Sequence, residues 1–183
     1  MWKFIRIAVI VIVVLLGGVL IVAATKPDTF RIERSADIKA PPEKILVYIA
    51  DFHRWGLWSP YEKLDPAMQR DYSGAATGKG AVYSWASDGK AGAGRMEIAD
   101  VSPTRVLIEL DFAKPFESHN MAEFTLTPGG DATNPDTKVT WAMYGPNLFI
   151  GKVMSLFFDT DKMIGADFET GLANLKAEAE KAD

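Results

Sequence analysis

The chain has 183 residues, which suffices for one domain with an appendage but not for two ordinary domains. Its formal net charge is −4, so it lacks the basic surface on which nucleic-acid binding depends, and we expect no nucleic-acid partner. The absence of cysteine excludes disulfides, thiolate nucleophiles and cysteine-based zinc sites. The two histidines, His53 and His119, show no metal-ligand spacing, and we expect neither a metal nor a cofactor.

Residues 1–25 are predicted to form a membrane anchor. Residues 7–24 are an unbroken apolar run, which at about 1.5 Å per residue nearly spans a hydrocarbon core of roughly 30 Å. Trp2 suits the membrane interface and Arg6 can reach the head groups, so the predicted membrane contact covers residues 2–24. Secretion after cleavage of a signal peptide near Ala24 is the alternative. The run is longer than the roughly 7–15 apolar residues of a signal peptide, which favours the anchor.

The soluble part begins with a linker, a strand and a helix. Residues 26–29 form the polar linker, in which Pro27 ends the membrane helix. Residues 30–38 alternate between apolar and polar side chains, which predicts a strand. Pro42 and Glu43 are typical of a helix N-terminus, so we predict a helix there, followed by an aromatic turn at residues 51–60.

The middle of the chain has the pattern of an antiparallel sheet. Six further strands are predicted, at residues 69–73, 81–87, 94–101, 105–113, 122–128 and 138–144. The segments between them are rich in Gly, Pro, Asn and Asp and are too short for helical crossovers. Alternation of apolar and polar side chains along the strands leaves one apolar face, which requires a cover.

The C-terminal segment, residues 148–181, is predicted to supply that cover as a long helix. Its apolar residues, among them Phe157, Ile164 and Phe168, recur at steps of three and four. A break is possible near residues 159–161. With no repeats in the sequence, we expect a single domain over residues 30–183.

A family resemblance rests on two motifs. Ala40-Pro41-Pro42-Glu43-Lys44-Ile45 is followed by Asp51-Phe52 and Trp55-Gly56-Leu57-Trp58-Ser59-Pro60, and residues 161–172 look like a closing helix. With the element order, these motifs resemble the START-like superfamily, also called SRPBCC, which includes polyketide cyclase/dehydrase and lipid-transport proteins. The resemblance implies an α+β helix-grip fold: an antiparallel sheet of about seven strands wrapped around the long C-terminal helix, with a cavity between them. By the same analogy, the anchor lies in a bacterial inner membrane with the domain in the periplasm.

The predicted cavity residues follow from strand parity and helical spacing, and simple core packing is the alternative for each. Trp85, Trp141 and Tyr144 are favoured because a buried N–H or O–H needs a partner. Asp161 is included because it could orient a ligand head group, although a helix cap is the alternative. The predicted ligand-binding set is Tyr83, Trp85, Ile108, Leu110, Phe112, Phe124, Trp141, Met143, Tyr144, Met154, Phe157, Asp161, Ile164 and Phe168.

Three functions follow for such a domain. The first is binding of a lipid or other hydrophobic small molecule by a membrane-tethered carrier or sensor. The second is a polyketide cyclase- or dehydratase-like enzyme acting on a bulky apolar substrate, with Glu97, Tyr83 or Tyr144 as reacting groups. The third is a non-catalytic interaction module with a collapsed cavity. No catalytic residue is assigned, since parity turns the other mid-strand carboxylate, Glu109, outward, and the sequence leaves the oligomeric state open.

Overall fold

The computed structural model describes residues 2–131 and 133–181, so the predicted chain limits at residues 1 and 183 lie outside the described residues. The main helices are α1 (Trp2–Ala24), α2 (Pro42–Ile49), α3 (Trp55–Trp58), α4 (Phe149–Met154) and α5 (Thr160–Ala179), with 3-10 helices η1 (Phe52–Arg54) and η2 (Pro60–Lys63). The strands are β1 (Thr29–Ile38), β2 (Gln69–Gly74), β3 (Ala81–Ala86), β4 (Ala93–Ser102), β5 (Arg105–Lys114), β6 (Ser118–Gly130) and β7 (Pro135–Pro146).

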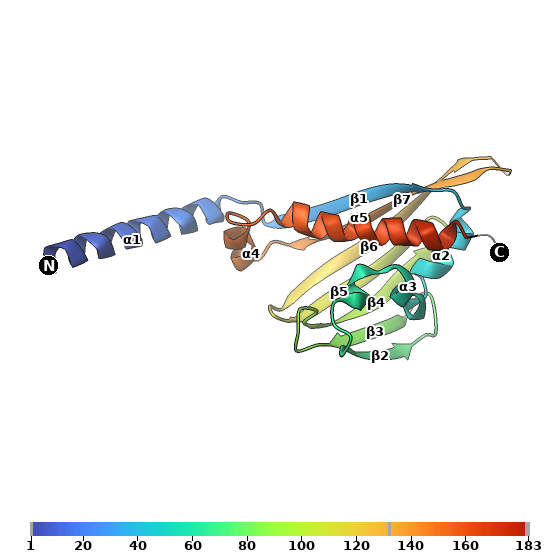
Figure 1. The fold of residues 1–183 in the computed structure, drawn as a ribbon, viewed down its shortest axis with the longest axis horizontal. Coiled ribbons are helices and arrows are strands. Elements are labelled where there is room, and N and C mark those ends of the chain that lie inside the picture. The colour runs from blue at the N-terminus through green and yellow to red at the C-terminus, as the bar shows by residue number, and fades with distance from the viewer. Residues whose placement is uncertain (1, 132, 182–183) are drawn as a thin grey trace.

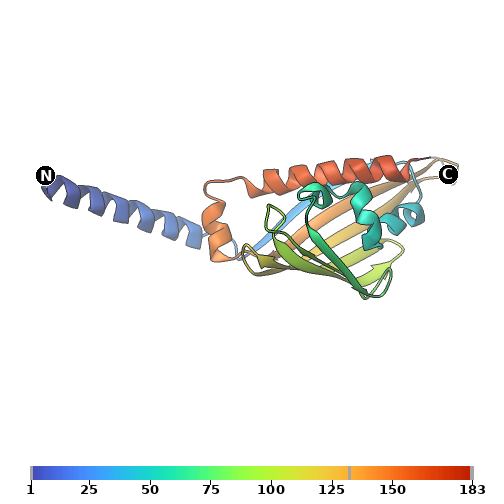
Figure 2. The same ribbon diagram turned by 60° about the horizontal axis from the view of Figure 1, so that its bottom comes forward.

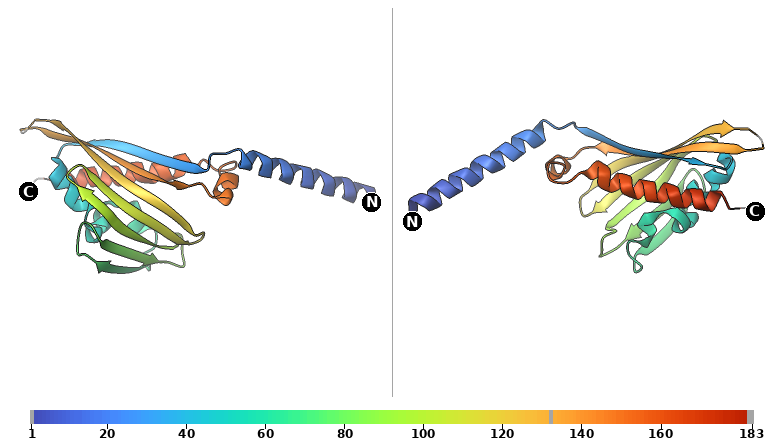
Figure 3. Two further views of the ribbon diagram at one scale, coloured as in Figure 1. Left: turned by 180° about the vertical axis from the view of Figure 1, so that it is seen from behind. Right: turned by 45° about the horizontal axis from the view of Figure 1, so that its top comes forward.

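The strands form one antiparallel sheet in the order β1-β7-β6-β5-β4-β3-β2. Sequential strands from β2 to β7 are neighbours, as short turns require, and β1 closes the order beside β7. The curved sheet holds α5 against its inner face (Figures 1 and 2). Seen from behind, the outer face carries no helix (Figure 3, left). The predicted α+β helix-grip fold is confirmed.

An aromatic cluster joins α5 to the sheet. The rings of Trp141 in β7 and Phe168 in α5 stack with centroids 4.1 Å apart, and Phe124 in β6 stacks on Trp141 at 5.0 Å. Trp58 meets the edge of this stack, with its centroid 5.4 Å from that of Trp141. All four side chains are buried. Burial of such rings contributes about 1.5–3 kcal/mol per side chain, and the ring pairs add about 0.5–1.5 kcal/mol each.

The segment from α2 to η2 covers the part of the sheet that α5 leaves open. Pro42 lies in the first turn of α2, where the missing N–H costs nothing. The segment then turns back on itself through two indole hydrogen bonds: Trp55 Nε1 donates to the carbonyl of Ile49 at 3.0 Å and Trp58 Nε1 to that of Tyr48 at 3.1 Å. Because both indole donors are satisfied, the two tryptophans are buried without a desolvation penalty.

The helix α1 extends away from the domain (Figures 1 and 3). It is long and apolar enough to cross a membrane, and a signal sequence would have the same properties. Among the described residues of α1, Ala23 is buried against the domain, and the other side chains are exposed or half-buried.

The C-terminal cover is two helices instead of one. The chain leaves α4 after Met154, and α5 begins at Thr160, where Asp159 caps the new helix by accepting from the backbone N–H of Lys162 at 3.0 Å. The predicted break is therefore present, and the cap is Asp159 instead of Asp161.

Candidate functional site

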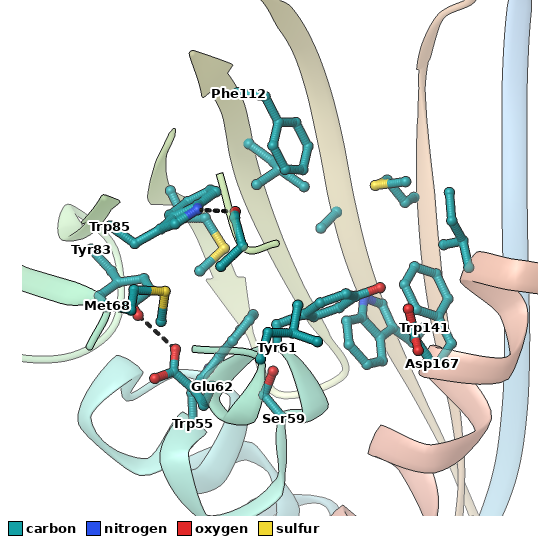
Figure 4. A pocket seen from close by; sticks show the side chains of 18 residues that line it. Trp55, Ser59, Tyr61, Glu62, Met68, Tyr83, Trp85, Phe112, Trp141 and Asp167 are labelled. Atoms are coloured by element: carbon teal, nitrogen blue, oxygen red, sulfur yellow. Dashed lines mark hydrogen bonds between the residues drawn. The ribbon is translucent and has the colours of Figure 1, made fainter. Parts of the chain in front are cut away.

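A cavity of about 230 Å³ lies between the inner face of the sheet, α5 and the segment from α3 to β2 (Figure 4). Its wall is mainly aromatic and aliphatic. The volume is just below the roughly 300–1,000 Å³ typical of small-molecule sites, so a ligand would be small or would widen the cavity. The lining residues are Trp55, Ser59, Tyr61, Glu62, Leu64, Met68, Tyr83, Trp85, Ala91, Met96, Leu110, Phe112, Ala122, Trp141, Met143, Ile164, Asp167 and Phe168.

Eight of the predicted site residues line this cavity. Strand parity brings them together, because every second side chain of a strand points to the same face. Six come from the sheet and two from α5. They are Tyr83, Trp85, Leu110, Phe112, Trp141, Met143, Ile164 and Phe168. Their role in binding a ligand stays a prediction.

Two predicted residues lie in the core instead of the cavity wall. Ile108 and Phe124 do face inward, but both are fully buried among other side chains. They support the wall without lining it.

Tyr144 and Asp161 are also misplaced by the prediction. Tyr144 lies on the outer face, where the Arg31 guanidinium sits 5.1 Å from its ring centroid. Trp141 faces inward, so Tyr144, three positions further along the same strand, faces outward. The prediction placed Tyr144 in the cavity because a buried hydroxyl needs a partner, and strand parity outweighs that argument. Asp161 is exposed and pairs with Arg34 at 2.9 Å.

Met154 and Phe157 lie outside the cavity for a different reason. Met154 ends α4 and Phe157 follows it, with exposed fractions of 42% and 65%. The sequence pattern predicted them to face inward because it counts one uninterrupted helix through residues 148–181. In the structure the helix is interrupted between Met154 and Thr160. The break resets the helical phase, so the two side chains point to solvent.

The largest part of the wall that the sequence did not predict comes from the segment between α3 and β2. Trp55, Tyr61, Leu64 and Met68 all reach the cavity from there. The density of aromatic residues in 51–60 was a signal for this segment, but its short helices have no periodicity that indicates a face.

Two tyrosine–carboxylate pairs bring polar groups to the wall. Tyr83 donates a hydrogen bond to Glu62 Oε1 at 2.6 Å, and Arg70 Nε donates to Glu62 Oε2 at 2.7 Å. Tyr61 also lies close enough to Asp167 of α5 for that carboxylate to affect its pKa. Burial, followed by the neighbouring carboxylate, raises the pKa of both phenols above their ordinary value. Both tyrosines are therefore neutral hydroxyl donors at physiological pH, not bases.

Two further donors at the wall have no partner. Ser59 Oγ and Trp141 Nε1 are buried, and neither makes a hydrogen bond within the part of the chain that the structure describes. Figure 4 shows both side chains among those that line the cavity. A buried polar group without a partner costs about 1–3 kcal/mol. Both atoms are covered, so a ligand with a hydrogen-bond acceptor would reach them only after the wall widens.

The other titratable residues singled out in the sequence lie away from the cavity. Glu97 forms an ion pair with Arg95 beside it on β4, and Glu109 is exposed on β5. His119 is exposed and lies 2.7 Å from Asp111. No group of three or more metal-ligating side chains occurs among residues 2–131 and 133–181.

An antiparallel sheet that grips a long helix around an apolar cavity defines the helix-grip class of proteins. Within this class, the family model for polyketide cyclase / dehydrase and lipid transport matches residues 29–180, and the chain belongs to that family. The predicted family resemblance is thereby confirmed.

Solved structures share the fold at low sequence identity. Protein CV1439 from Chromobacterium violaceum is 14% identical with a TM-score of 0.53, covering 85% of this chain and 100% of that one. Norcoclaurine synthase from Thalictrum flavum is 12% identical with a TM-score of 0.56, covering 85% and 96%. DynU16, from the dynemicin biosynthetic locus, is 18% identical with a TM-score of 0.55, covering 85% and 48%. No curated protein matches the chain by sequence.

Proposed function

We propose that this protein binds a hydrophobic small molecule or lipid in its internal cavity, as a membrane-tethered carrier or sensor. The observation that carries the proposal is the cavity itself: about 230 Å³ lined mainly by aromatic and aliphatic side chains. An open cavity favours binding over the alternative of an interaction module with a collapsed cavity.

The ligand that fits best is mainly apolar with one hydrogen-bond acceptor, such as a carbonyl oxygen. The apolar wall would hold its body, and the unpaired donors of Ser59 and Trp141 would orient the acceptor. A cationic head group would find no partner in these donors.

The membrane part of the proposal rests on α1. We propose that residues 1–25 anchor the chain, that residues 26–29 link the anchor to the domain over residues 30–183, and that the domain lies in a bacterial periplasm. If instead a signal peptide is cleaved near Ala24, the chain recovered from cells will have a mass below the 20.1 kDa of the full chain. Intact-mass measurement of the protein from washed membranes distinguishes the two.

Ligand binding can be tested by filling the cavity. Ala122→Phe adds a ring at a buried position of the wall, whereas Thr125→Phe adds the same ring on the exposed outer face of the same strand. We would release full-length wild type and both variants from detergent micelles for native mass spectrometry, extract any passenger, and titrate each with a fluorescent fatty acid. Circular dichroism would verify that each variant is folded.

The expected result is a passenger or fatty-acid uptake in wild type and Thr125→Phe, and a loss of it in folded Ala122→Phe. Equal uptake by all three proteins would place the ligand outside the cavity. If none of them binds an apolar molecule, the carrier proposal is wrong.

A second candidate, the cyclase- or dehydratase-like enzyme, is favoured by Tyr61 and the nearby carboxylate of Asp167 on an apolar wall. A neutral phenol beside a carboxylate can donate a proton or hydrogen bond to a substrate oxygen. Under this candidate, Tyr61→Phe abolishes turnover of a bound substrate while binding is retained. Under the carrier proposal, the bound molecule is recovered chemically unchanged from both proteins.

A further inference from the structure

Exposed large apolar side chains gather around α4 and the start of α5. Their exposed fractions run from 42% to 65%, and between residues 148 and 158 Lys152 is the one charged residue. Single exposed apolar residues are normal on a protein surface, but a contiguous group marks a contact site. We call this group the α4 patch; it consists of Leu148, Phe149, Ile150, Met154, Phe157, Phe158 and Met163.

The α4 patch lies beside the carboxyl end of α1. The helices α1 and α4 are in contact, and Ala23 near the end of α1 is fully buried. Figures 1 and 2 both show α4 where α1 joins the domain. If α1 spans a membrane, its last residues lie at the boundary between lipid and water, and α4 lies at the same depth.

The linker is tied to α4 by specific bonds. Asn147 donates its backbone N–H to the carbonyl of Asp28 at 2.7 Å and its side-chain amide to that of Pro27 at 3.1 Å. Lys152, which is buried in α4, pairs with the Asp28 carboxylate at 2.5 Å. These contacts fix the position of α4 relative to the end of α1, so the patch cannot turn away from the membrane surface without breaking them.

The charges near the patch balance, and most of them are engaged. Lys152 pairs with Asp28, Asp161 pairs with Arg34, and Asp159 caps α5, while Lys162 is exposed. An anionic lipid would therefore gain little from this surface. The chemistry that suits it is the apolar layer just beneath the head groups, where aromatic and aliphatic side chains are favoured.

We propose that the α4 patch inserts into the interfacial layer of the same membrane that holds α1, as a second contact between the domain and lipid. This inference rests on the proposed anchor. It also orients the cavity, because the half-buried wall residues Phe112, Met143 and Ile164 lie toward the ends of β5, β7 and α5 on the side of the domain where α4 follows β7. The docked patch therefore holds this end of the cavity close to the lipid.

The absence of native cysteine allows a clean test with single-cysteine variants of the full chain. An environment-sensitive fluorophore would be attached at Phe157→Cys in the patch, at Leu16→Cys in the middle of α1, and at Glu109→Cys on the outer face of the sheet. Each protein would be reconstituted in phosphatidylcholine vesicles. The readouts are the emission wavelength, quenching by lipid nitroxides carried either near the head group or near the middle of the acyl chain, and quenching by aqueous iodide.

The proposal predicts that the probe at position 157 emits at shorter wavelength than the probe at 109, is quenched by the lipid nitroxide, and is several-fold less accessible to iodide. Adding Phe149→Asp and Phe158→Asp should restore quenching of the probe at 157 by iodide, while the probe at 16 should remain shielded from iodide by lipid. Added salt should change neither result.

Three outcomes would overturn the inference, and they differ in what they say about the anchor. A probe at 157 that iodide reaches freely, with the probe at 16 quenched by lipid, leaves the anchor intact and removes the patch contact. A probe at 157 shielded from both quenchers indicates that protein covers the patch, such as a second copy of the chain. A probe at 16 that neither the head-group nor the acyl-chain nitroxide quenches contradicts the anchor and, with it, the patch contact.

Discussion

The Ser59 hydroxyl offers a test in which protein stability and ligand affinity should change in opposite directions. Its oxygen is fully buried, lines the cavity and has no hydrogen-bond partner. Ser59 occupies the N-cap position of η2, but its side chain makes no capping bond, so the usual loss on replacing an N-cap serine does not apply. Ser59→Ala therefore removes an unsatisfied polar group and little else.

The magnitudes follow from the cost of such groups. An unsatisfied buried hydroxyl costs about 1–3 kcal/mol, so the ligand-free variant should be more stable than wild type by about 1–2 kcal/mol. For a protein of this size, that corresponds to a rise in Tm of about 2–8 °C. If the ligand accepts a hydrogen bond from Ser59, its loss costs about 0.5–1.5 kcal/mol, which weakens binding by roughly 2- to 10-fold.

Thr137→Val is a matched control. The Thr137 hydroxyl is also fully buried, but it donates to the carbonyl of Ala40 at 2.7 Å, and the residue does not line the cavity. Its removal should lower stability by about 1 kcal/mol and leave ligand affinity unchanged. Near-UV circular dichroism on heating would measure Tm, and titration with a fluorescent fatty acid would measure affinity.

The reasoning is refuted if Ser59→Ala destabilises the ligand-free protein as much as Thr137→Val does, because the hydroxyl would then have a partner. Unchanged affinity in a stabilised Ser59→Ala variant would refute only the ligand contact.

Three further predictions concern α5 and the linker. Phe168→Ala removes the ring that stacks on Trp141 and should lower the free energy of unfolding by about 3–5 kcal/mol in chemical denaturation; a loss below about 1 kcal/mol would contradict the assigned packing. Gly171→Ala would place a Cβ atom 2.7 Å from the Trp141 ring. Because overpacking of about 1–3 kcal/mol outweighs a helix-propensity gain of about 1 kcal/mol, the variant should be less stable and bind ligand more weakly. A more stable variant would show that the ring can move aside. The hydrogen bond and charge of Lys152 hold the pKa of Asp28 below its ordinary value of 3.8. This contact therefore stabilises the fold above that pH and is lost as the pH falls through the lower folded-state pKa. Amide exchange in α4 should rise in that acid range, and in the Asp28→Asn variant it should already be raised at neutral pH.

Most of the sheet was predictable because its signals are local. Alternation along β5 and β7 placed Leu110, Phe112, Trp141 and Met143 on the inner face, where the structure has them. The strand ends were less predictable. The strand β6 begins at Ser118, four residues before the predicted start, because polar residues such as His119 at an exposed strand end carry no alternating pattern.

The remainder of the site depends on tertiary packing. No periodicity in the sequence indicates that Tyr61 points to the cavity or that Asp167 of α5 meets it. The two donors left without partners are a property of the assembled wall, since Trp55 and Trp58 have the same side chain as Trp141 but satisfy their N–H groups with nearby carbonyls. Sequence can therefore predict which face is apolar, but not which polar atoms remain available to a ligand.

The end of the cavity nearest α4 has a wall that should move easily. Met163 belongs to the α4 patch and the next residue, Ile164, lines the cavity, so the start of α5 takes part in both. This end of α5 is held by Arg34, which pairs with Asp161 and Glu169. The Arg34 side chain is 24% exposed, but both carboxylates are more than half exposed. Exposed ion pairs contribute little to stability, and a cavity at the lower limit of ligand size has to widen for exchange.

Arg34→Gln should therefore accelerate ligand release with only a small change in Tm. Lys176→Gln is the matched control, because Lys176 makes a similar exposed pair with Glu180 at the far end of α5. Stopped-flow dissociation of a fluorescent fatty acid from the full chain in vesicles would show a faster rate for Arg34→Gln and a wild-type rate for Lys176→Gln. Equal acceleration in both variants would mean that general loosening of α5, not movement at its N-terminal end, limits exchange. Wild-type rates in both would place the exit elsewhere in the wall.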